Sequence, residues 1–101
     1  MIKIHITKKA RQDLRDIYIY FYDSWGKKQA LNYYSKLQSS IYNKIQLNPK
    51  IGNSYNYIKT SYRKYKVSQH SIFYHQQSEK IYTIRILHQK MDSKKHLEIN
   101  C

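Results

Sequence analysis

One run of the sequence combines residues that could bind nucleic acid. Residues 62–66 read Tyr-Arg-Lys-Tyr-Lys, so tyrosine rings are interleaved with cations. Cationic side chains neutralise phosphates and aromatic rings stack on bases, which is the chemistry of single-strand binding. The same run also fits an ordinary β-strand with one tyrosine-rich face. The sequence leaves both interpretations open.

Other kinds of site lack the residues that they need. Two glycines, Gly26 and Gly52, are too few for a phosphate-binding loop or a dinucleotide fingerprint, so we expect no nucleotide cofactor. His70 and His75 are an odd number of positions apart and would lie on opposite faces of one strand. No carboxylate pair completes an oxygen-rich site beside them, so we expect no metal. The lone cysteine, Cys101, is consistent with a reducing cytosol.

The charge of the chain is large and unevenly placed. Its 101 residues carry 19 Lys and Arg against 6 Asp and Glu, a net charge of +13, and residues 24–78 contain no acid. With 41% hydrophobic and 15% aromatic residues the chain can fold, and no apolar run is long enough to span a membrane. We therefore expect a soluble, cytoplasmic protein with one domain over residues 1–101 and an anionic partner rather than a membrane.

The first part of the chain predicts a strand followed by a helix. Residues 2–6 alternate apolar and polar side chains, which indicates a strand with one buried face. Thr7 is suited to cap a helix, because its hydroxyl can accept a backbone N–H. Apolar residues then recur at spacings of three and four from Ala10 to Trp25, which predicts a helix over 8–23.

A second helix and three strands follow. The same apolar spacing runs from Ala30 to Ile45, and the helix should end near Leu47 because Pro49 disfavours helical geometry before it. Residues 50–61 are predicted as a loop. Strand-like runs then follow, joined by short links that imply antiparallel hairpins, at 62–67, 71–76 and 81–88.

The predicted order is therefore β-α-α-β-β-β. We expect an α+β fold in which an antiparallel helical hairpin packs on a small, mostly antiparallel sheet, followed by a basic tail over 89–101.

Several short motifs occur along most of the chain, in an order and at spacings that are typical of a known protein family. They are Ala10-Arg-Gln-Asp-Leu14, Trp25-Gly26, Asn48-Pro49, Tyr62-Arg63, Ile72-Phe73-Tyr74 and the closing run Arg85-Ile86-Leu87-His88 with Met91-Asp92 and His96-Leu97. In these residues the chain resembles the ParE family of bacterial toxins, within the RelE/ParE superfamily. The closing run is the most specific of the matches.

The resemblance implies a fold and a function. It implies the same β-α-α-β-β-β order, and a toxin that poisons DNA gyrase and is neutralised by a small ParD-like or related antitoxin. The acid-free stretch 24–78 would then suit an acidic antitoxin segment that folds on binding. The residues expected to bind target or antitoxin, or to hold the tail in place, are Trp25, Arg63, Lys64, Lys66, Arg85, Met91, Asp92 and His96.

Two of these residues have a competing structural interpretation. Trp25 could anchor a partner, but its phase with Phe21 favours packing in the core. Asp92 could fix the tail by pairing with Arg85 or Lys90.

The superfamily also contains ribosome-dependent messenger-RNA endonucleases, which gives an alternative function with the ribosome and its message as partners. That reaction needs a base, cations for the phosphorane and an acid. The candidates here are Arg63, Arg85 and His88, with Tyr74 as the acid. Arg85 and His88 should face opposite sides of a regular strand, and residues 24–78 offer no glutamate base. A third possibility is a basic interaction module without toxicity.

Overall fold

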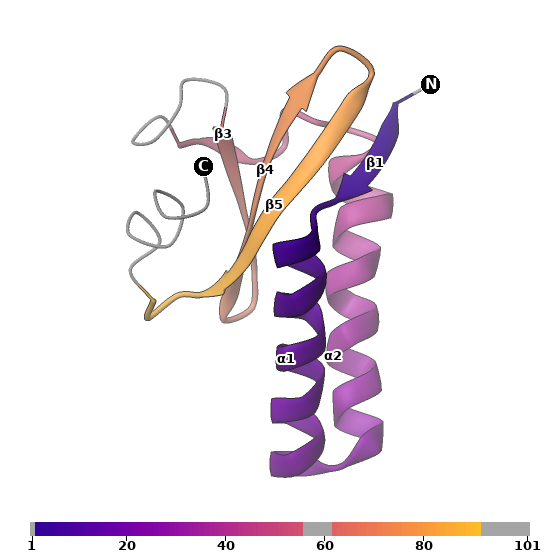
Figure 1. The fold of residues 1–101 in the computed structure, drawn as a ribbon, viewed down its shortest axis with the longest axis vertical. Helices are drawn as coiled ribbons and strands as arrows, with labels where there is room; N and C mark the ends of the chain where they lie inside the picture. Colours follow the sequence, from indigo (N-terminus) through magenta and orange to yellow (C-terminus); the bar gives the residue numbers. More distant parts are fainter. Residues whose placement is uncertain (1, 56–61, 92–101) are drawn as a thin grey trace.

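A helical hairpin packs on one face of a five-stranded sheet (Figure 1). The computed structural model describes residues 2–55 and 62–91. The sheet order is β1-β5-β4-β3-β2, with β1 parallel to β5 and every other neighbouring pair antiparallel. The elements are β1 (Lys3–Ile6), α1 (Lys8–Trp25), α2 (Lys27–Ser39), the π-helix η1 (Ser40–Ile45), β2 (Asn53–Ser54), β3 (Tyr62–Val67), β4 (His70–Gln77) and β5 (Lys80–His88). The predicted α+β fold is confirmed.

Thr7 and Gly26 set the two ends of α1. The Thr7 hydroxyl accepts the Ala10 N–H at 3.2 Å and donates to the Ile84 carbonyl of β5 at 3.0 Å, so the helix cap is also a tie to the sheet. Gly26 has a φ of 90°, which favours glycine, and its N–H closes the last turn on the Tyr22 carbonyl. One glycine therefore ends α1 and starts α2.

Several predicted boundaries are wrong in detail. The first helix continues to Trp25, and the stretch predicted as a loop contains β2, which pairs with Arg63 and Lys64. The second helix finishes as η1, in which the Gln46 N–H bonds to the Ile41 carbonyl at 3.0 Å. The hairpin turns are two residues long, and each begins with a serine of positive φ, Ser68 and Ser78.

The core lies between the hairpin and the facing side of the sheet. The apolar spacing correctly identifies most of the helix faces, since the buried apolar residues of the helices are Ala10, Leu14, Ile17, Ala30, Leu37, Ile41 and Ile45. They pack against sheet residues that include Ile72, Tyr74, Ile81 and Ile86. None of the helices in the described part of the chain is long and apolar enough to cross a membrane.

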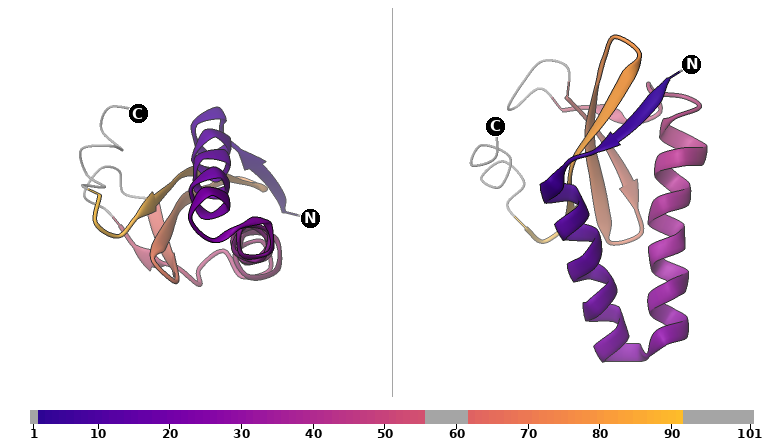
Figure 2. Two further views of the ribbon diagram at one scale, coloured as in Figure 1. Left: turned by 90° about the horizontal axis from the view of Figure 1, so that it is seen from below. Right: turned by 45° about the vertical axis from the view of Figure 1, so that its right-hand side comes forward.

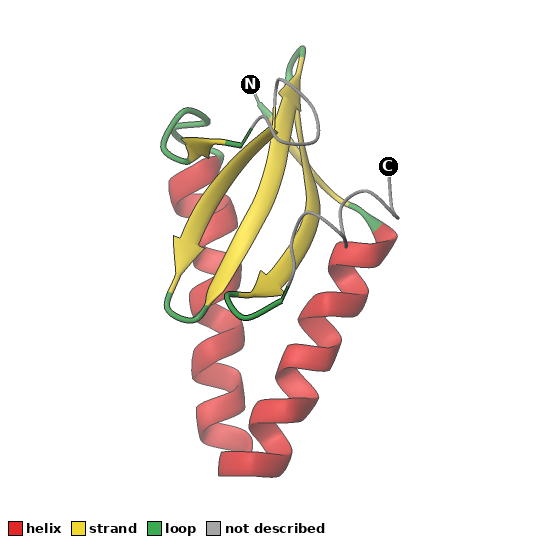
Figure 3. Ribbon diagram, turned by 90° about the vertical axis from the view of Figure 1, so that its left-hand side faces the viewer, coloured by secondary structure: helices red, strands yellow, loops and turns green. Residues whose placement is uncertain are grey.

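Trp25 is not part of this core, although its helical phase predicts burial. Its side chain is 58% exposed. Figures 2 and 3 show the reason, because the turn between α1 and α2 projects well beyond the ends of the strands. The helical periodicity places Trp25 on the side of α1 that faces the core. The sheet, however, does not extend as far as the end of the helix where Trp25 lies.

A carboxylate on α1 completes the edge of β5. The ladder between β4 and β5 shifts between Phe73 and Tyr74, which leaves Ile84 as an extra residue in a bulge. Among the described residues, β1 pairs with β5 as far as Thr83. Beyond it, Asp13 Oδ2 accepts the Ile86 N–H at 2.9 Å and Arg85 Nε at 2.7 Å, and Oδ1 accepts Arg85 Nη2 at 2.9 Å.

His70 joins the end of the sheet to α2. It is 7% exposed, and its Nδ1 lies 2.6 Å from the hydroxyl of Tyr33, a bond that a neutral imidazole can accept. Burial lowers the pKa of His70 to about 4, the nearby His88 also lowers it, and Asp13 opposes the shift. The folded protein therefore favours the uncharged form of this histidine.

We predict that His70 makes the fold less stable in acid. The unfolded chain protonates this histidine near its ordinary pKa of about 6.5, whereas the folded chain does so only near pH 4. The free energy of unfolding should therefore fall as pH drops through this window, by up to about 1.4 kcal/mol per pH unit. Denaturant unfolding across pH should show a weaker dependence in His70→Gln than in the parent. The exposed His5→Gln is the control, and equal pH slopes in His70→Gln and the parent would contradict the prediction.

Candidate functional site

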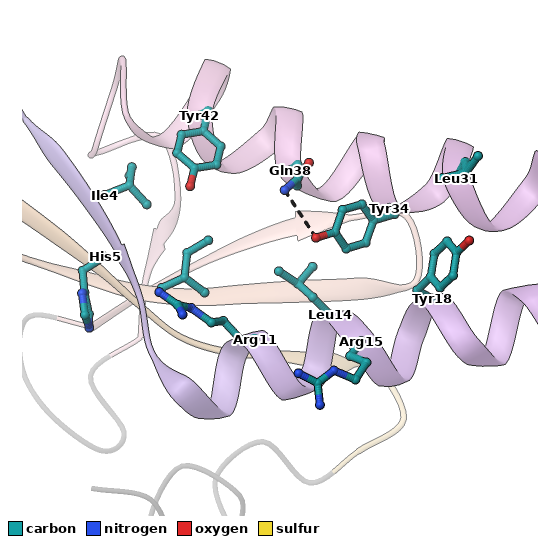
Figure 4. Close-up of a pocket in the computed structure, with 11 residues that line it drawn as sticks. Ile4, His5, Arg11, Leu14, Arg15, Tyr18, Leu31, Tyr34, Gln38 and Tyr42 are labelled. Carbon is teal, nitrogen blue, oxygen red and sulfur yellow. Dashed lines mark hydrogen bonds between the residues drawn. The ribbon is translucent and has the colours of Figure 1, made fainter.

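A groove runs between α1 and α2 beside the edge strand β1 (Figure 4). Its volume is about 620 Å³. The wall formed by α1 consists of Arg11, Leu14, Arg15 and Tyr18, which share one side of the helix. The two guanidinium groups therefore lie next to apolar surface.

The opposite wall comes from α2 and η1. It contains Leu31, Tyr34, Gln38 and Tyr42, and Gln38 Nε2 donates to the Tyr34 hydroxyl at 3.4 Å. Leu31 is 45% exposed and Tyr42 is 42% exposed, so apolar surface remains open to solvent in the isolated chain. None of the described residues that line the groove is acidic. We call this site the helix groove.

A second pocket, of about 570 Å³, is lined by residues of α1, by Tyr33 of α2, and by residues at the β3–β4 turn and the end of β5. It shares no lining residue with the helix groove. It brings together two predicted binding residues, Trp25 and Met91, with His88 and Tyr20. The Trp25 ring lies edge-on to Tyr20, with 5.8 Å between centroids. Asp92 and His96, which were predicted with this group, lie outside the described residues.

Arg63 and Tyr74 hold the segment that leads into β2. Arg63 Nη1 donates to the carbonyl of Gly52 at 2.7 Å. The buried Tyr74 hydroxyl donates to the Pro49 carbonyl at 2.7 Å and accepts the Gly52 N–H at 3.0 Å, and burial raises its pKa. Gly52 is required by this close approach, because a Cβ there would lie 2.7 Å from the Tyr74 hydroxyl. These two candidates have structural partners.

Arg85 and His88 also have hydrogen-bond partners within the protein. Arg85 pairs with Asp13, and both side chains are 11% exposed; the hydrogen bond raises the pKa of the arginine. His88 Nδ1 accepts the Lys90 N–H at 3.1 Å. The β4–β5 register is regular from Arg85 to His88, so the two side chains leave the strand on opposite sides, as predicted. The bulge at Ile84 precedes both residues and does not bring them together.

The basic, tyrosine-rich run 62–66 lies in β3, and its tyrosine rings have partners within the protein. Tyr62 is 5% exposed and its ring stacks on His75, which in turn stacks on Tyr82. Tyr65 packs against the core. These contacts occupy ring faces that base stacking would need.

The two lysines of the run face different surroundings. Lys64 Nζ lies 5.8 Å from the centre of the Tyr55 ring. Lys66 is exposed beside the end of α2.

Sequence reasoning missed the helix groove and the Asp13 ion pair. The spacing of Arg11, Arg15 and Tyr18 on one side of α1 was an available signal for the groove. Asp13 and Arg85 are 72 positions apart, so no local pattern links them.

Comparison with known proteins gives a consistent result. Residues 4–93 match the model of the family described as "ParE toxin of type II toxin-antitoxin system, parDE". The chain is 36% identical to Toxin ParE1 of Mycobacterium tuberculosis over 93 residues and 33% identical to Toxin ParE1 of Caulobacter vibrioides over 92 residues. Each alignment covers 91% of this chain and 94% of the relative.

A solved structure shares the fold. It is titled "Chromosomal ParDE TA system from P. aeruginosa" and superposes with a TM-score of 0.75 at 20% identity, covering 87% of this chain and 96% of the other. Because the family match spans nearly all of the described residues and agrees with the fold, the chain belongs to the ParE toxin family of parDE type II toxin–antitoxin systems.

Proposed function

We propose that this toxin inhibits DNA gyrase by binding it, without a chemical step of its own, and so blocks replication in the cytoplasm. The observation that supports binding over catalysis is that candidate catalytic side chains already form hydrogen bonds within the protein. Arg63, Tyr74 and Arg85 each hold part of the fold together through hydrogen bonds of 2.7 Å. A catalytic group must reach the substrate in the geometry of the reaction.

We further propose that an acidic antitoxin neutralises the toxin by docking in the helix groove. The groove offers apolar walls to an amphipathic segment, and Arg11 and Arg15 offer partners to its carboxylates. The net charge of +13 would also speed the association of an acidic partner.

The target would use a different surface from the antitoxin. Trp25 and Met91 line the second pocket, which shares no lining residue with the groove, and their exposed side chains would act as anchors there. Arg63, Lys64, Lys66 and Arg85, together with Asp92 and His96, complete the proposed set, with Arg63 and Arg85 acting by holding the surface in shape.

We predict that the purified toxin inhibits supercoiling by purified gyrase at micromolar concentration. Premixing with the cognate antitoxin should restore supercoiling. In a parallel assay with the same toxin, messenger RNA on translating ribosomes should not be cleaved. Full supercoiling activity at micromolar toxin would contradict the gyrase proposal, and message cleavage would favour the ribosome instead.

We predict that Arg11→Glu/Arg15→Glu weakens antitoxin binding by at least about tenfold, because the groove would then repel carboxylates. Calorimetry with the purified antitoxin gives the affinity. The matched control is Lys27→Glu/Lys28→Glu, which makes the same charge change at exposed positions at the tip of the hairpin. If the two double variants lose affinity equally, general electrostatics explains the binding and the groove does not.

A further inference from the structure

A third pocket, of about 370 Å³, lies between the C-terminal part of the second helix and β3. It shares no lining residue with the helix groove. Three of its residues are lysines that come from the second helix and the sheet: Lys36 on α2, Lys44 on η1 and Lys66 on β3. We call it the lysine pocket.

The fold places these lysines around one pocket. Lys36, Ser40 and Lys44 follow at intervals of four along the helix, and the Ser40 hydroxyl donates to the Lys36 carbonyl at 2.9 Å. Lys36 Nζ donates to the Ser68 hydroxyl at 2.9 Å, which ties the helix to the β3–β4 turn. In the described strand pairing, β2 pairs with Arg63 and Lys64 of β3. It does not extend to Lys66, so this edge of β3 has no strand partner at Lys66 among the described residues.

The pocket gathers positive charge without a counter-charge. None of its described lining residues is acidic, and the sequence has no acid from position 24 to 78. Three ammonium groups at one pocket repel one another, and the hydrogen bond of Lys36 goes to a neutral hydroxyl. A bound anion would remove this repulsion.

The lining chemistry matches phosphate. Six of the eight lining residues are lysine or serine. The three ammonium groups and the hydroxyls of Ser39 and Ser68 provide donors for several oxygens of one anion, whereas the Ser40 hydroxyl donates within its helix. An acidic peptide needs apolar surface as well, to offset the cost of ordering it, and the helix groove provides more of that. We propose that the lysine pocket binds a phosphate of a nucleic-acid backbone. This proposal does not depend on gyrase being the target.

The test compares three variants by fluorescence anisotropy with a short, fluorescein-labelled DNA duplex. Lys36→Ala/Lys44→Ala/Lys66→Ala should weaken binding and lower the slope of log affinity against log salt by about 0.9 for each phosphate that the variant no longer neutralises. Lys27→Ala/Lys28→Ala/Lys80→Ala removes the same charge from exposed residues outside the pocket and should change the slope less. The triple Lys→Arg variant at positions 36, 44 and 66 keeps the charge and should keep the binding.

A fourth variant separates a loss of binding from a folding defect. Lys44→Ala/Lys66→Ala leaves the Lys36–Ser68 hydrogen bond in place and should still lose affinity, with an unchanged thermal unfolding midpoint. Equal losses in the pocket and control triples would overturn the proposal. It would also be overturned if a polyglutamate peptide, and not the duplex, bound in a manner that depended on the three pocket lysines.

Discussion

The carboxylate of Asp13 fixes α1 against the sheet at the point where β1 ends. It accepts three hydrogen bonds, two from Arg85 and one from the Ile86 backbone, and the ion pair is largely removed from solvent. A short strand that pairs with β5 only to Thr83 would leave the next part of that edge open. A helical side chain takes the place of a further strand residue, and it ties α1 to β5 one helical turn or more beyond the Thr7 cap.

The position of α1 in turn creates two different surfaces. Arg11 and Arg15 line the helix groove, whereas Asp16 lines the second pocket. One helix thus contributes two cations to one surface and an acid to the other. A toxin that must meet an antitoxin and a target can use these two surfaces for different partners.

Periodicity predicted the first strand and the two helices because the spacing of apolar residues reflects which side chains are buried. The three long strands were predicted from their β-branched and aromatic residues and the short links between them. Thr7 was recognised as a cap because its role depends on its immediate neighbours in the chain. The two residues of β2 have no periodicity to read, and their strand exists because β3 lies beside them. The bulge at Ile84 is likewise a property of the pairing between two strands.

The candidate site was less predictable because its residues depend on distant partners. The sequence offered Asp92, which lies outside the described residues, as a partner of Arg85 or Lys90. It did not indicate Asp13, from the other end of the chain, which forms the ion pair with Arg85. Arg63 and Tyr74 suggested chemistry by residue type, while their bonds to Gly52 and Pro49 depend on a loop that only the fold brings near. Residue type therefore identified side chains with specific interactions in the fold, but it did not identify their partners.

The most direct test is the free energy of unfolding of Asp13→Asn, measured in guanidinium chloride beside Asp16→Asn as the exposed control on the same helix. Removing one partner of a buried ion pair leaves the other charge uncompensated, so Asp13→Asn should lose about 3 kcal/mol or more. Asp16→Asn should change by less than about 0.5 kcal/mol. A loss in Asp13→Asn no larger than that of Asp16→Asn would contradict the central place of this carboxylate in the fold.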